Sequence, residues 1–379
     1  MAGWHFYGNP SKKLKIVGVT GTNGKTTTAT LLYKVATELG YKAGLIGTVE
    51  NIIAGEKIKH SETAPQTTPD PIRLNKLLKE MADRGCEYVF MEVSSHAMDQ
   101  RRVAGVNFSG GIFTNLTHDH LDYHKNFENY FTAKKKFFQV LPKNAFALSN
   151  ADDAYGEKIL EGIKAKKYIY GFKTKADFNE LLQSKLIGEF NMYNILAIYG
   201  ASVLLGFDKE KVKEIIKNLK PVAGRFENIE GKNGVIGIVD YAHTPDALEK
   251  VLLAIQGFRK EGSKIILVFG CGGDRDPSKR SKMGKIGATL SDIAIFTSDN
   301  PRSEDADKII TEMISDLSPD DLKKVIPMAD RHQAIADAVK LAKKGNIILL
   351  AGKGHETYQE IKGVKYPFDD MEELKKNFK

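Results

Sequence analysis

The segment from Lys15 to Thr27 constrains the fold of this chain more than any other, and it reads Lys-Ile-Val-Gly-Val-Thr-Gly-Thr-Asn-Gly-Lys-Thr-Thr. A short apolar run leads into Gly21 and Gly24, and Lys25 and Thr26 follow at once. Glycines let backbone N–H groups turn inward around an anion, a lysine adds positive charge, and a threonine hydroxyl can bind Mg²⁺. The segment therefore predicts a strand, a triphosphate-binding loop and a helix, in that order.

The residues around this loop refine the prediction. Apolar residues between Leu31 and Leu39 recur at three- and four-residue spacing, and Gly40 stands where a helix commonly ends. The spacing departs from the common G-x-x-x-x-G-K-[ST] pattern, because Val19 occupies the first glycine position and Gly18 lies one residue earlier. We still expect a phosphate loop that opens a helix.

Length and composition limit the class of protein. A chain of 379 residues is too long for one compact core, which predicts two domains. The net charge of +8 suits an anionic partner, but 48 acidic residues are interleaved with the basic ones and no nucleic-acid motif is present. We therefore expect phosphorylated small molecules and no nucleic acid. Cys86 and Cys271 lack metal-ligand spacing and predict free thiols.

No signal peptide precedes the first strand, and no apolar run reaches membrane-spanning length. These observations predict a cytoplasmic protein that has no membrane partner. We further expect a monomer.

Apolar runs alternate with helical patterns along the whole chain, which is typical of α/β proteins with parallel sheets. The runs that predict strands are residues 15–20, 87–91, 111–114, 235–239, 265–269, 293–297 and 347–350. Pro221 and Gly224 interrupt the pattern after a predicted helix over 208–219. We expect a residual linker over 1–14, a central P-loop-type ATPase domain with a mostly parallel sheet over 15–221, and a smaller Rossmann-like α/β domain over 222–379. A basic stretch over 164–175 predicts a solvated loop or strand.

Polar residues follow most of these strands. In parallel sheets ligands bind beyond the carboxyl ends of the strands, so these residues are candidates for a site. They are Glu92 to His96, Asn115 to His120, Asp240 to His243, Gly270 to Arg275, Ser298 to Arg302 and Ala351 to Glu356.

Residue type alone leaves the role of several candidate residues open. Glu92 is a magnesium ligand, a neighbour of a helix N-cap or a solvated charge. The segment from His118 to His124 is dense in titratable side chains and is either functional or a polar surface turn. Lys134 is, on composition, an exposed lysine of an amphipathic helix. Arg302 is either a carboxylate-binding fork or a surface arginine that starts a helix after Pro301.

Taken in order, the motifs resemble those of the Mur ligases. The resemblance begins with Gly-Thr-Asn-Gly-Lys-Thr-Thr at 21–27, Met-Glu-Val-Ser-Ser-His at 91–96, Thr-Asn-Leu-Thr-His-Asp-His-Leu-Asp-Tyr-His at 114–124 and Ala-Lys at 133–134. It continues with Asn-Met-Tyr-Asn at 191–194, Gly-Arg-Phe-Glu at 224–227, Asp-Tyr-Ala-His-Thr-Pro at 240–245, Asp-Asn-Pro-Arg at 299–302 and Gly-Lys-Gly-His-Glu at 352–356. The later motifs are similar to those of the branch that adds the third residue of the peptide.

The resemblance implies roles for individual residues. Lys25, Glu92, His120 and Lys134 would be catalytic, with Lys134 converted by CO₂ into a carbamate. Thr26, Glu92, His120 and the carbamate of Lys134 would hold two Mg²⁺ ions. ATP would be bound by Thr22, Asn23, Gly24, Lys25, Thr26, Thr27, Asn115, Asn191, Arg225, Asp240 and His243. The muramyl-peptide acceptor would be held by Thr67, Thr68, Ser94, Gln100 and Arg102. The incoming amino acid would be held by Arg275, Asp299, Asn300, Pro301, Arg302, Gly352 and Glu356.

The implied reaction is ATP-dependent peptide-bond formation through an acyl phosphate in peptidoglycan precursor synthesis. Arg302, Asn300 and Arg275 offer donors for a carboxylate, and Glu356 offers an acceptor for an amino group. A diamino acid that carries both groups at its far end, meso-diaminopimelate, satisfies this set. Two alternatives stay open: a relative that acts on another carboxylate carrier, as folylpolyglutamate synthetases do, and a nucleotide-dependent scaffold without catalysis.

The start of the chain departs from the family pattern. The family normally begins with a domain that binds the uridine diphosphate of the acceptor, whereas Trp4 to Ser11 resembles the linker after it. We expect this chain to lack that domain, so the sequence leaves open whether the acceptor is linked to UDP or to a different carrier.

Overall fold

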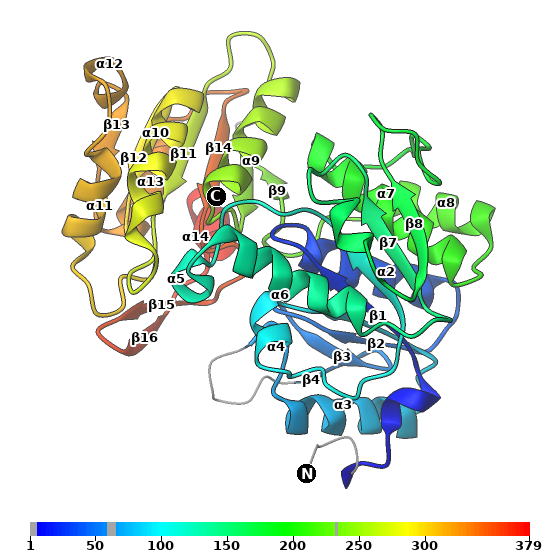
Figure 1. Ribbon diagram of the computed structural model, residues 1–379. Helices are drawn as coiled ribbons and strands as arrows, with labels where there is room; N and C mark the ends of the chain where they lie inside the picture. Colours follow the sequence, from blue (N-terminus) through cyan, green and yellow to red (C-terminus); the bar gives the residue numbers. More distant parts are fainter. Residues whose placement is uncertain (1–5, 59–65, 232–233) are drawn as a thin grey trace. The chain divides into compact units, whose positions relative to one another are not determined.

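The computed structural model describes residues 6–58, 66–231 and 234–379, so the expected linker over 1–14 lies partly outside the described residues. The chain divides into two compact units (Figure 1). The first comprises Met1–Thr117 and Tyr123–Lys220, and the second comprises His118–Asp122 and Pro221–Lys379. A short 3-10 helix, η1 (Pro10–Lys13), precedes the first strand.

The first unit contains, within the described residues, an eight-stranded sheet in the order β4-β3-β2-β5-β1-β6-β7-β8. Its strands are β1 (Lys15–Thr20), β2 (Ala43–Ile46), β3 (Asn51–Ile53), β4 (Glu56–Ile58), β5 (Tyr88–Glu92), β6 (Phe108–Phe113), β7 (Phe146–Asn150) and β8 (Lys166–Tyr170). In the part of the sheet ordered β2-β5-β1-β6-β7-β8, each strand pairs with its neighbours in parallel. The β2–β3 and β3–β4 pairs are antiparallel. The predicted strands β5, β1 and β6 are adjacent, so their polar ends meet at one edge.

Several helices in this unit begin after a side chain that caps them, whereas α2 and α7 begin after a glycine. Asp70 accepts hydrogen bonds from the N–H groups of Ile72 and Arg73 at the start of α3, where Pro71 has no N–H to satisfy. The helices are α2 (Lys25–Glu38), α3 (Pro71–Asp83), α4 (Ser95–Asp99), α6 (Phe127–Gln139), η2 (Lys158–Leu160), α7 (Glu189–Leu204) and α8 (Lys209–Asn218). A short helix, α5 (Leu121–His124), contains residues of both units.

The second unit contains, among its described residues, a six-stranded sheet in the order β13-β12-β11-β14-β10-β9. Its strands are β9 (Glu227–Glu230), β10 (Ile236–Asp240), β11 (Ile265–Phe269), β12 (Ile293–Phe296), β13 (Val325–Pro327) and β14 (Ile347–Ala351), and a hairpin is formed by β15 (Tyr358–Ile361) and β16 (Val364–Pro367). Only β9 is antiparallel to its neighbour in the sheet. The helices are α9 (Pro245–Phe258), η3 (Pro277–Lys279), α10 (Arg280–Leu290), α11 (Ala306–Ile314), α12 (Pro319–Leu322), α13 (Arg331–Leu341) and α14 (Asp370–Asn377).

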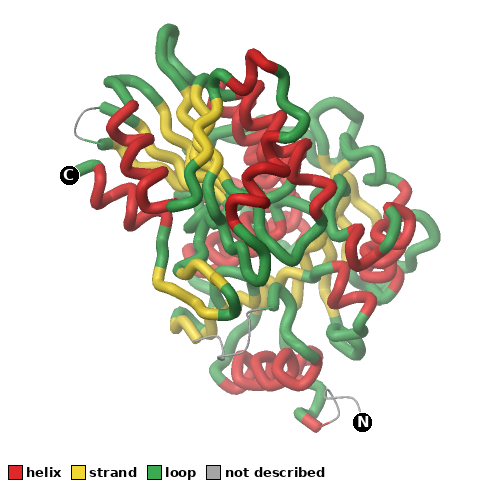
Figure 2. The backbone as a smooth tube through the Cα atoms, turned by 90° about the vertical axis from the view of Figure 1, so that its left-hand side faces the viewer, coloured by secondary structure: helices red, strands yellow, loops and turns green. Residues whose placement is uncertain are grey.

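Alternate residues of β11 pack toward opposite faces of this sheet. Ile266 and Val268 join a core cluster with Ile335 of α13. Leu267 points the other way, since a Cβ added at Gly287 of α10 would lie 2.8 Å from its Cδ2. Helices therefore cover both faces, as Figure 2 shows for the unit that carries the C-terminus, and this explains why the strands read as continuous apolar runs.

The α/β class and the mostly parallel sheets are thus confirmed. The expected strands match observed ones to within three residues at each end, and the basic stretch over 164–175 contains β8. Cys86 and Cys271 are free and buried. None of the helices in the described part of the chain has the length and apolar character needed to cross a bilayer.

Candidate active site

The phosphate loop lies between β1 and α2 and is tightly packed. Gly21 has a φ of 152° and Gly24 a φ of 83°, where side chains are strained. A Cβ added at Gly21 would lie 1.9 Å from Thr114 Oγ1, and one at Gly24 would lie 2.5 Å from Asn194 Oδ1. Only glycine fits at these two positions, and a backbone free of side chains is what close approach of a phosphate requires.

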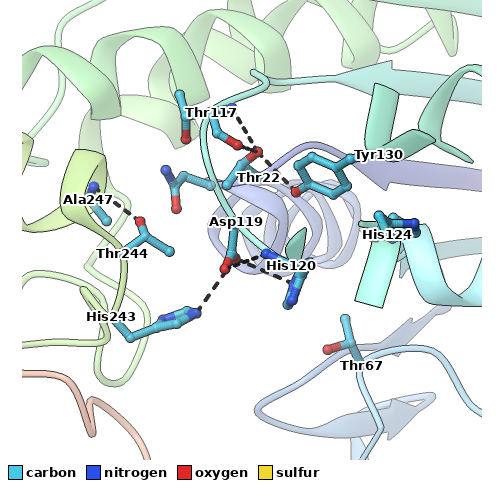
Figure 3. A network of polar contacts seen from close by, with 12 residues as sticks. Thr22, Thr67, Thr117, Asp119, His120, His124, Tyr130, His243, Thr244 and Ala247 are labelled. Carbon is cyan, nitrogen blue, oxygen red and sulfur yellow. Dashed lines mark hydrogen bonds and ion pairs between the residues drawn. The ribbon is translucent and has the colours of Figure 1, made fainter. Parts of the chain in front are cut away.

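Asn115 fixes the shape of the loop from the end of β6. Its backbone carbonyl accepts from the N–H of Thr22 at 2.9 Å, and its Oδ1 accepts from the N–H of Asn23 at 2.9 Å. Its amide nitrogen donates to the carbonyl of Asn23 at 3.2 Å. The Thr22 hydroxyl in turn bonds the Tyr130 hydroxyl at 3.1 Å and accepts from the N–H of Thr117 (Figure 3). The loop is held from several sides before any ligand contact.

Lys25 holds its ammonium against the loop. Its Nζ donates to the carbonyls of Gly21 at 2.9 Å and Thr22 at 2.7 Å. Thr27 is buried on the first turn of the helix. Asn191, on the first turn of α7, accepts from Asn194 Nδ2 at 3.2 Å, and Asn194 borders Gly24. The predicted nucleotide residues of the first unit therefore surround one loop.

Glu92 is a buried carboxylate that adjoins the helix start. It is 1% exposed at the end of β5, and its Oε2 accepts from Thr26 Oγ1 at 3.0 Å. Thr48, which sequence reasoning missed, donates its N–H to Oε1 at 2.7 Å and its hydroxyl to Oε2 at 3.1 Å. The reading of Glu92 as a solvated charge is wrong.

The oxygens of Glu92 and Thr26 fit Mg²⁺, which prefers hard oxygen ligands. The described residues contain no group of three or more His, Cys, Asp and Glu side chains that could hold a metal ion. Of the expected ligands, Thr26, Glu92 and Lys134 belong to the first unit and His120 to the second.

Lys134 is buried rather than exposed, so the expectation from composition was wrong. It is 1% exposed on α6, and its Nζ donates to the carbonyl of Gly21 at 2.8 Å. The same Nζ lies 4.5 Å from the centre of the Tyr130 ring. Its position beside the phosphate loop agrees with a role at that loop, while carbamylation stays a prediction.

The residues expected to hold the acceptor form one connected group. Thr68 Oγ1 donates to the carbonyl of Glu92 at 2.8 Å and accepts from the N–H of Ser94 at 3.0 Å. Arg102 donates to the carbonyl of Thr68 at 2.8 Å and to Gln100 Oε1 at 2.9 Å. Thr67 Oγ1 accepts from Thr48 Oγ1 at 3.1 Å, which places this group beside the Glu92 carboxylate.

The segment 118–122 carries a charged cluster of the second unit. The Asp119 carboxylate lies 3.4 Å from His120 Nε2 and 4.0 Å from His243 Nε2 (Figure 3). It also lies 4.0 Å from Lys279 Nζ. Burial opposes ionisation, but His120, His243 and Lys279 together hold the pKa of Asp119 well below its usual range. The reading of this segment as a plain surface turn is therefore wrong for Asp119.

The other predicted nucleotide residues of the second unit cluster at the end of β10. Burial raises the pKa of Asp240 to about 6, against the opposing charge of Arg225, and its Oδ2 accepts from the N–H of Phe226 at 2.7 Å. The Arg225 guanidinium lies 4.4 Å from the centre of the Tyr241 ring, and His243 Nδ1 lies 2.8 Å from the Tyr241 carbonyl oxygen. These contacts bring Arg225, Asp240 and His243 together.

The residues expected to bind the amino acid meet at the ends of β11, β12 and β14. Asn300 Nδ2 donates to Glu356 Oε2 at 2.7 Å. Arg302 Nη1 donates to the carbonyl of Gly273 at 2.6 Å. A Cβ added at Gly272 would lie 3.1 Å from Arg302 Nη1 and 3.8 Å from Arg275 Cγ, so the two arginines border one glycine.

Further backbone contacts complete this group. Pro301 packs its carbonyl over Gly273, and Gly352 borders the Asp299 carboxylate. Arg302 does not start a helix, since it bridges to Ile361 of the hairpin and α11 begins at Ala306. The alternative for Arg302 is therefore wrong.

Arg280 organises the loop that bears Arg275 and was missed by sequence reasoning. It is 2% exposed and bonds both oxygens of Glu304 at 2.8 Å, Glu312 at 2.7 Å and the carbonyl of Gly272 at 3.3 Å. Its hydrogen bonds lower the pKa of Glu304 to about 2. Glu304 also accepts from the N–H of Asp274 at 2.6 Å, so the loop is tied to α10 and α11.

Comparison with known families gives two matches that follow one another along the chain. Residues 19–181 match the Mur ligase middle domain, and residues 224–354 match the Mur ligase, glutamate ligase domain. Curated relatives named UDP-N-acetylmuramoyl-L-alanyl-D-glutamate--2,6-diaminopimelate ligase include that of Bacteroides thetaiotaomicron, 53% identical, with 98% of this chain and 80% of the relative covered. The relative of that name from Clostridium botulinum is 42% identical, with 99% and 80% covered.

Solved structures agree with these matches. A structure with the same ligase name is 31% identical and has a TM-score of 0.66, with 99% of this chain and 81% of that chain covered. A folylpolyglutamate synthase from Mycobacterium tuberculosis has a TM-score of 0.73 at 15% identity, with 93% and 90% covered, and supports the fold alone.

Proposed function

The chain belongs to the Mur ligase family, and we propose on this basis that it is the ATP-dependent, ADP-forming ligase that adds meso-diaminopimelate to UDP-N-acetylmuramoyl-L-alanyl-D-glutamate in peptidoglycan precursor synthesis. Its family uses ATP and Mg²⁺. Residues 15–221 would bind ATP and the acceptor, and residues 222–379 the amino acid.

One observation in the second unit carries the choice of amino acid. Arg275 and Arg302 border one glycine, while Asn300 and Glu356 are joined at 2.7 Å. Guanidinium groups suit a carboxylate, and a carboxylate suits an ammonium group. A side chain that ends in both groups matches this set better than one that ends in an ammonium group alone.

We propose a reaction in two steps. The carboxylate of the acceptor attacks the γ-phosphorus of ATP, which releases ADP and gives an acyl phosphate. The amine of the diamino acid then attacks the acyl carbon, phosphate leaves, and the amine gives up a proton as the peptide bond forms. Both reactants of the first step are anionic, so positive charge must be supplied where they meet.

Residues of the first unit suit that requirement. The ammonium of Lys25 already lies against the carbonyls of Gly21 and Thr22 and would face the phosphates held by the loop. Thr26 would hold one Mg²⁺, and Glu92, His120 and the carbamate of Lys134 would hold a second. When bound, Mg²⁺ neutralises charge on the phosphates and on the transferred phosphoryl group.

A carbamate at Lys134 is part of the proposal. The ammonium would first lose a proton; the neutral amine would then form a bond to the carbon of CO₂ and lose a second proton, so that a cation becomes an anion. The side chain is 1% exposed and lies at the phosphate loop, where an added carboxylate group would serve Mg²⁺. Because the ammonium now donates to the Gly21 carbonyl, carbamylation would require that hydrogen bond to break.

The proposed function is tested by ADP release with purified acceptor and amino acid. Release should require both, and meso-diaminopimelate should be used far better than L-lysine, with the tripeptide product identified by mass spectrometry. Turnover that ignores the muramyl peptide, or that prefers another carboxylate carrier in competition, contradicts the proposal.

The arginine fork gives a sharper variant. Arg302→Lys keeps the charge but loses planar two-point binding, so KM for diaminopimelate should rise about 10-fold or more while KM for ATP stays the same. Arg259→Lys is the matched control, because Arg259 pairs with Asp292 at a partly exposed position. Equal effects of the two variants would contradict the assignment.

The carbamate is tested by ¹³C NMR after incubation with ¹³C-bicarbonate. A carbamate signal should appear in the wild type and in Lys136→Ala, which changes a half-exposed lysine of the same helix, and should vanish in Lys134→Ala. A signal that survives Lys134→Ala, or no signal in the wild type, would refute it. A cytoplasmic location and a monomeric state stay predictions, the second checked by light scattering.

A further inference from the structure

Lys353 is a fully buried lysine to which the chemistry above gives no role. It follows Gly352 at the end of β14 and is 0% exposed. Its Nζ lies 3.2 Å from Asn300 Oδ1, 3.3 Å from Glu356 Oε2 and 3.5 Å from Asp299 Oδ1. An ammonium is rarely buried this fully, because removing it from water is costly unless acceptors surround it.

Lys353 fixes the orientation of the Asn300 side chain. Asn300 Oδ1 accepts from Lys353 Nζ and, at 2.9 Å, from the N–H of Glu360. Its Nδ2 donates to Glu356 Oε2 at 2.7 Å. Turning the amide over would point its N–H groups at two donors and its oxygen at a carboxylate. Only one orientation is therefore compatible with these neighbours.

The backbone that carries Lys353 is also held. Arg331 donates to the carbonyl of Ala351 at 3.1 Å and is paired with Asp370, with both side chains fully buried. Gln359 Nε2 donates to the carbonyl of Asp299 at 2.8 Å. The lysine thus projects from a fixed strand end into a fixed group of acceptors.

The charges in this group do not cancel. Asp299 and Glu356 bring two carboxylates and Lys353 brings one ammonium. Burial, and next the charge of Asp299, raises the pKa of Glu356, whereas Lys353 and the hydrogen bond from Asn300 oppose that rise. The other charged or titratable groups that act on these carboxylates include Arg331, Tyr241, Tyr358 and the Cys271 thiol.

We propose that Lys353 is a positioning residue for the amino-acid substrate: its ammonium fixes the Glu356 carboxylate and the Asn300 amide in place and leaves one net negative charge to receive the ammonium end of a diamino acid. This inference rests on the proposed function, because Asn300 and Glu356 bind the amino acid only under that proposal. Lys353 itself acts through them and does not touch the substrate.

The first test is Lys353→Met, which keeps the length of the side chain and removes its charge. KM for diaminopimelate should rise about 10- to 100-fold, as expected for hydrogen bonds to a charged group, while KM for ATP changes less than about twofold. Without the cation the carboxylate is harder to ionise, so the acidic limb of kcat/KM for diaminopimelate should move up by about one pH unit or more. Lys340→Met, at a 70% exposed lysine of the same unit, is the control and should change neither.

A double-variant comparison separates positioning from packing. In a Glu356→Gln background the further change Lys353→Met should raise KM by less than about threefold, because the carboxylate on which Lys353 acts is gone. Equal factors in both backgrounds, or an unmoved acidic limb, would mean that Lys353 only fills the core and would overturn the inference.

A readout without turnover keeps the inference apart from the proposed function. In protein labelled with ¹³C-glutamate, the Glu356 carboxyl signal, identified by its loss in Glu356→Gln, should titrate at higher pH in Lys353→Met. If that variant does not fold, the ¹⁵N signal of the Lys353 ammonium in the wild type should shift as Glu356 ionises and should lose that shift in Glu356→Gln. If the Glu356 carboxyl signal titrates at the same pH in Lys353→Met, the inference is overturned even if the enzyme uses diaminopimelate. If the Lys353 and Glu356 signals depend on each other, the contact is upheld even if the enzyme does not use diaminopimelate.

Discussion

Loss of the buried ion pair between Arg331 and Asp370 should strongly lower the free energy of unfolding of the second unit. Both side chains are 0% exposed, with Nε to Oδ1 at 2.8 Å and Nη2 to Oδ2 at 2.7 Å. Asp370→Ala would leave the guanidinium buried without its charge partner. Removing one partner of such a pair costs about 3 to 5 kcal/mol, a large fraction of the total stability of a domain.

The size of the unit converts this into a temperature shift. For domains of 150 to 250 residues about 1 kcal/mol shifts Tm by about 2 to 4 °C, so Asp370→Ala should lower the transition of the second unit by about 6 to 20 °C. Trp4 is the one tryptophan of the sequence, so scanning calorimetry of the full chain follows this unit better than fluorescence.

Two further variants make the reasoning refutable. Asp320→Asn removes the exposed pair between Asp320 and Lys323 and should lower Tm by less than about 3 °C. The double change Arg331→Met with Asp370→Leu removes both charges and should recover most of the loss. A shift below about 2 °C for Asp370→Ala, or no recovery in the double variant, would show that the pair does not carry the stability assigned to it.

Three other outcomes follow from single positions. Gly21→Ala should lower ATP affinity at least about 10-fold in a fluorescent-nucleotide titration, because the added Cβ would lie 1.9 Å from Thr114 Oγ1. The control is Gly257→Ala, whose added Cβ would meet nothing within 4 Å. Equal ATP affinities of the two variants would contradict this role of packing at Gly21. Burial raises the pKa of Cys271 to about 12 and also raises that of Cys86, so both thiols should react with a chromogenic disulfide reagent only after unfolding, and fast labelling of native protein would contradict this. Burial raises the pKa of Asp240 to about 6, so the folded state holds this proton more tightly than the unfolded state; stability should fall by up to about 3 kcal/mol as pH rises from about 4 to 6, and urea unfolding of Asp240→Asn should lack that fall.

Much of the fold was predictable because central strands of both sheets are buried along their whole length. Such strands are continuous apolar runs, and Ile265–Phe269 was found without error. Three consecutive strands on one side of the first sheet, β2, β3 and β4, were not found. Ala43–Ile46 is a four-residue strand that contains a glycine, and β3 and β4 are shorter still. Because the strand over 43–46 was missed, Thr48 just after it was missed as well. Its N–H and its hydroxyl donate to the two oxygens of the Glu92 carboxylate.

Site residues that directly follow strands could be predicted from the sequence. Charged side chains that are buried, although their type is usually exposed, were harder to predict. Lys134 was expected to be exposed from composition because lysines usually are. Its spacing carried the opposite signal, since Tyr130, four residues before it, and Phe137, three residues after it, are buried on the same face of α6. Arg280 offered no such signal, because its partners Glu304 and Glu312 lie on later elements that only the fold brings near.

Each of the two units buries a lysine ammonium, Lys134 in the first and Lys353 in the second. Each is at most 1% exposed, and each lies against groups that the sequence assigned to substrates. Core packing alone would favour an apolar residue at both positions, because an ammonium loses several kcal/mol of hydration on burial. Each lysine is instead surrounded by acceptors: the Gly21 carbonyl and an aromatic ring in one unit, two carboxylates and an amide in the other. A charge kept at that cost orders the groups around it, so a neutral replacement of similar shape should disturb the ligand contacts of its own unit.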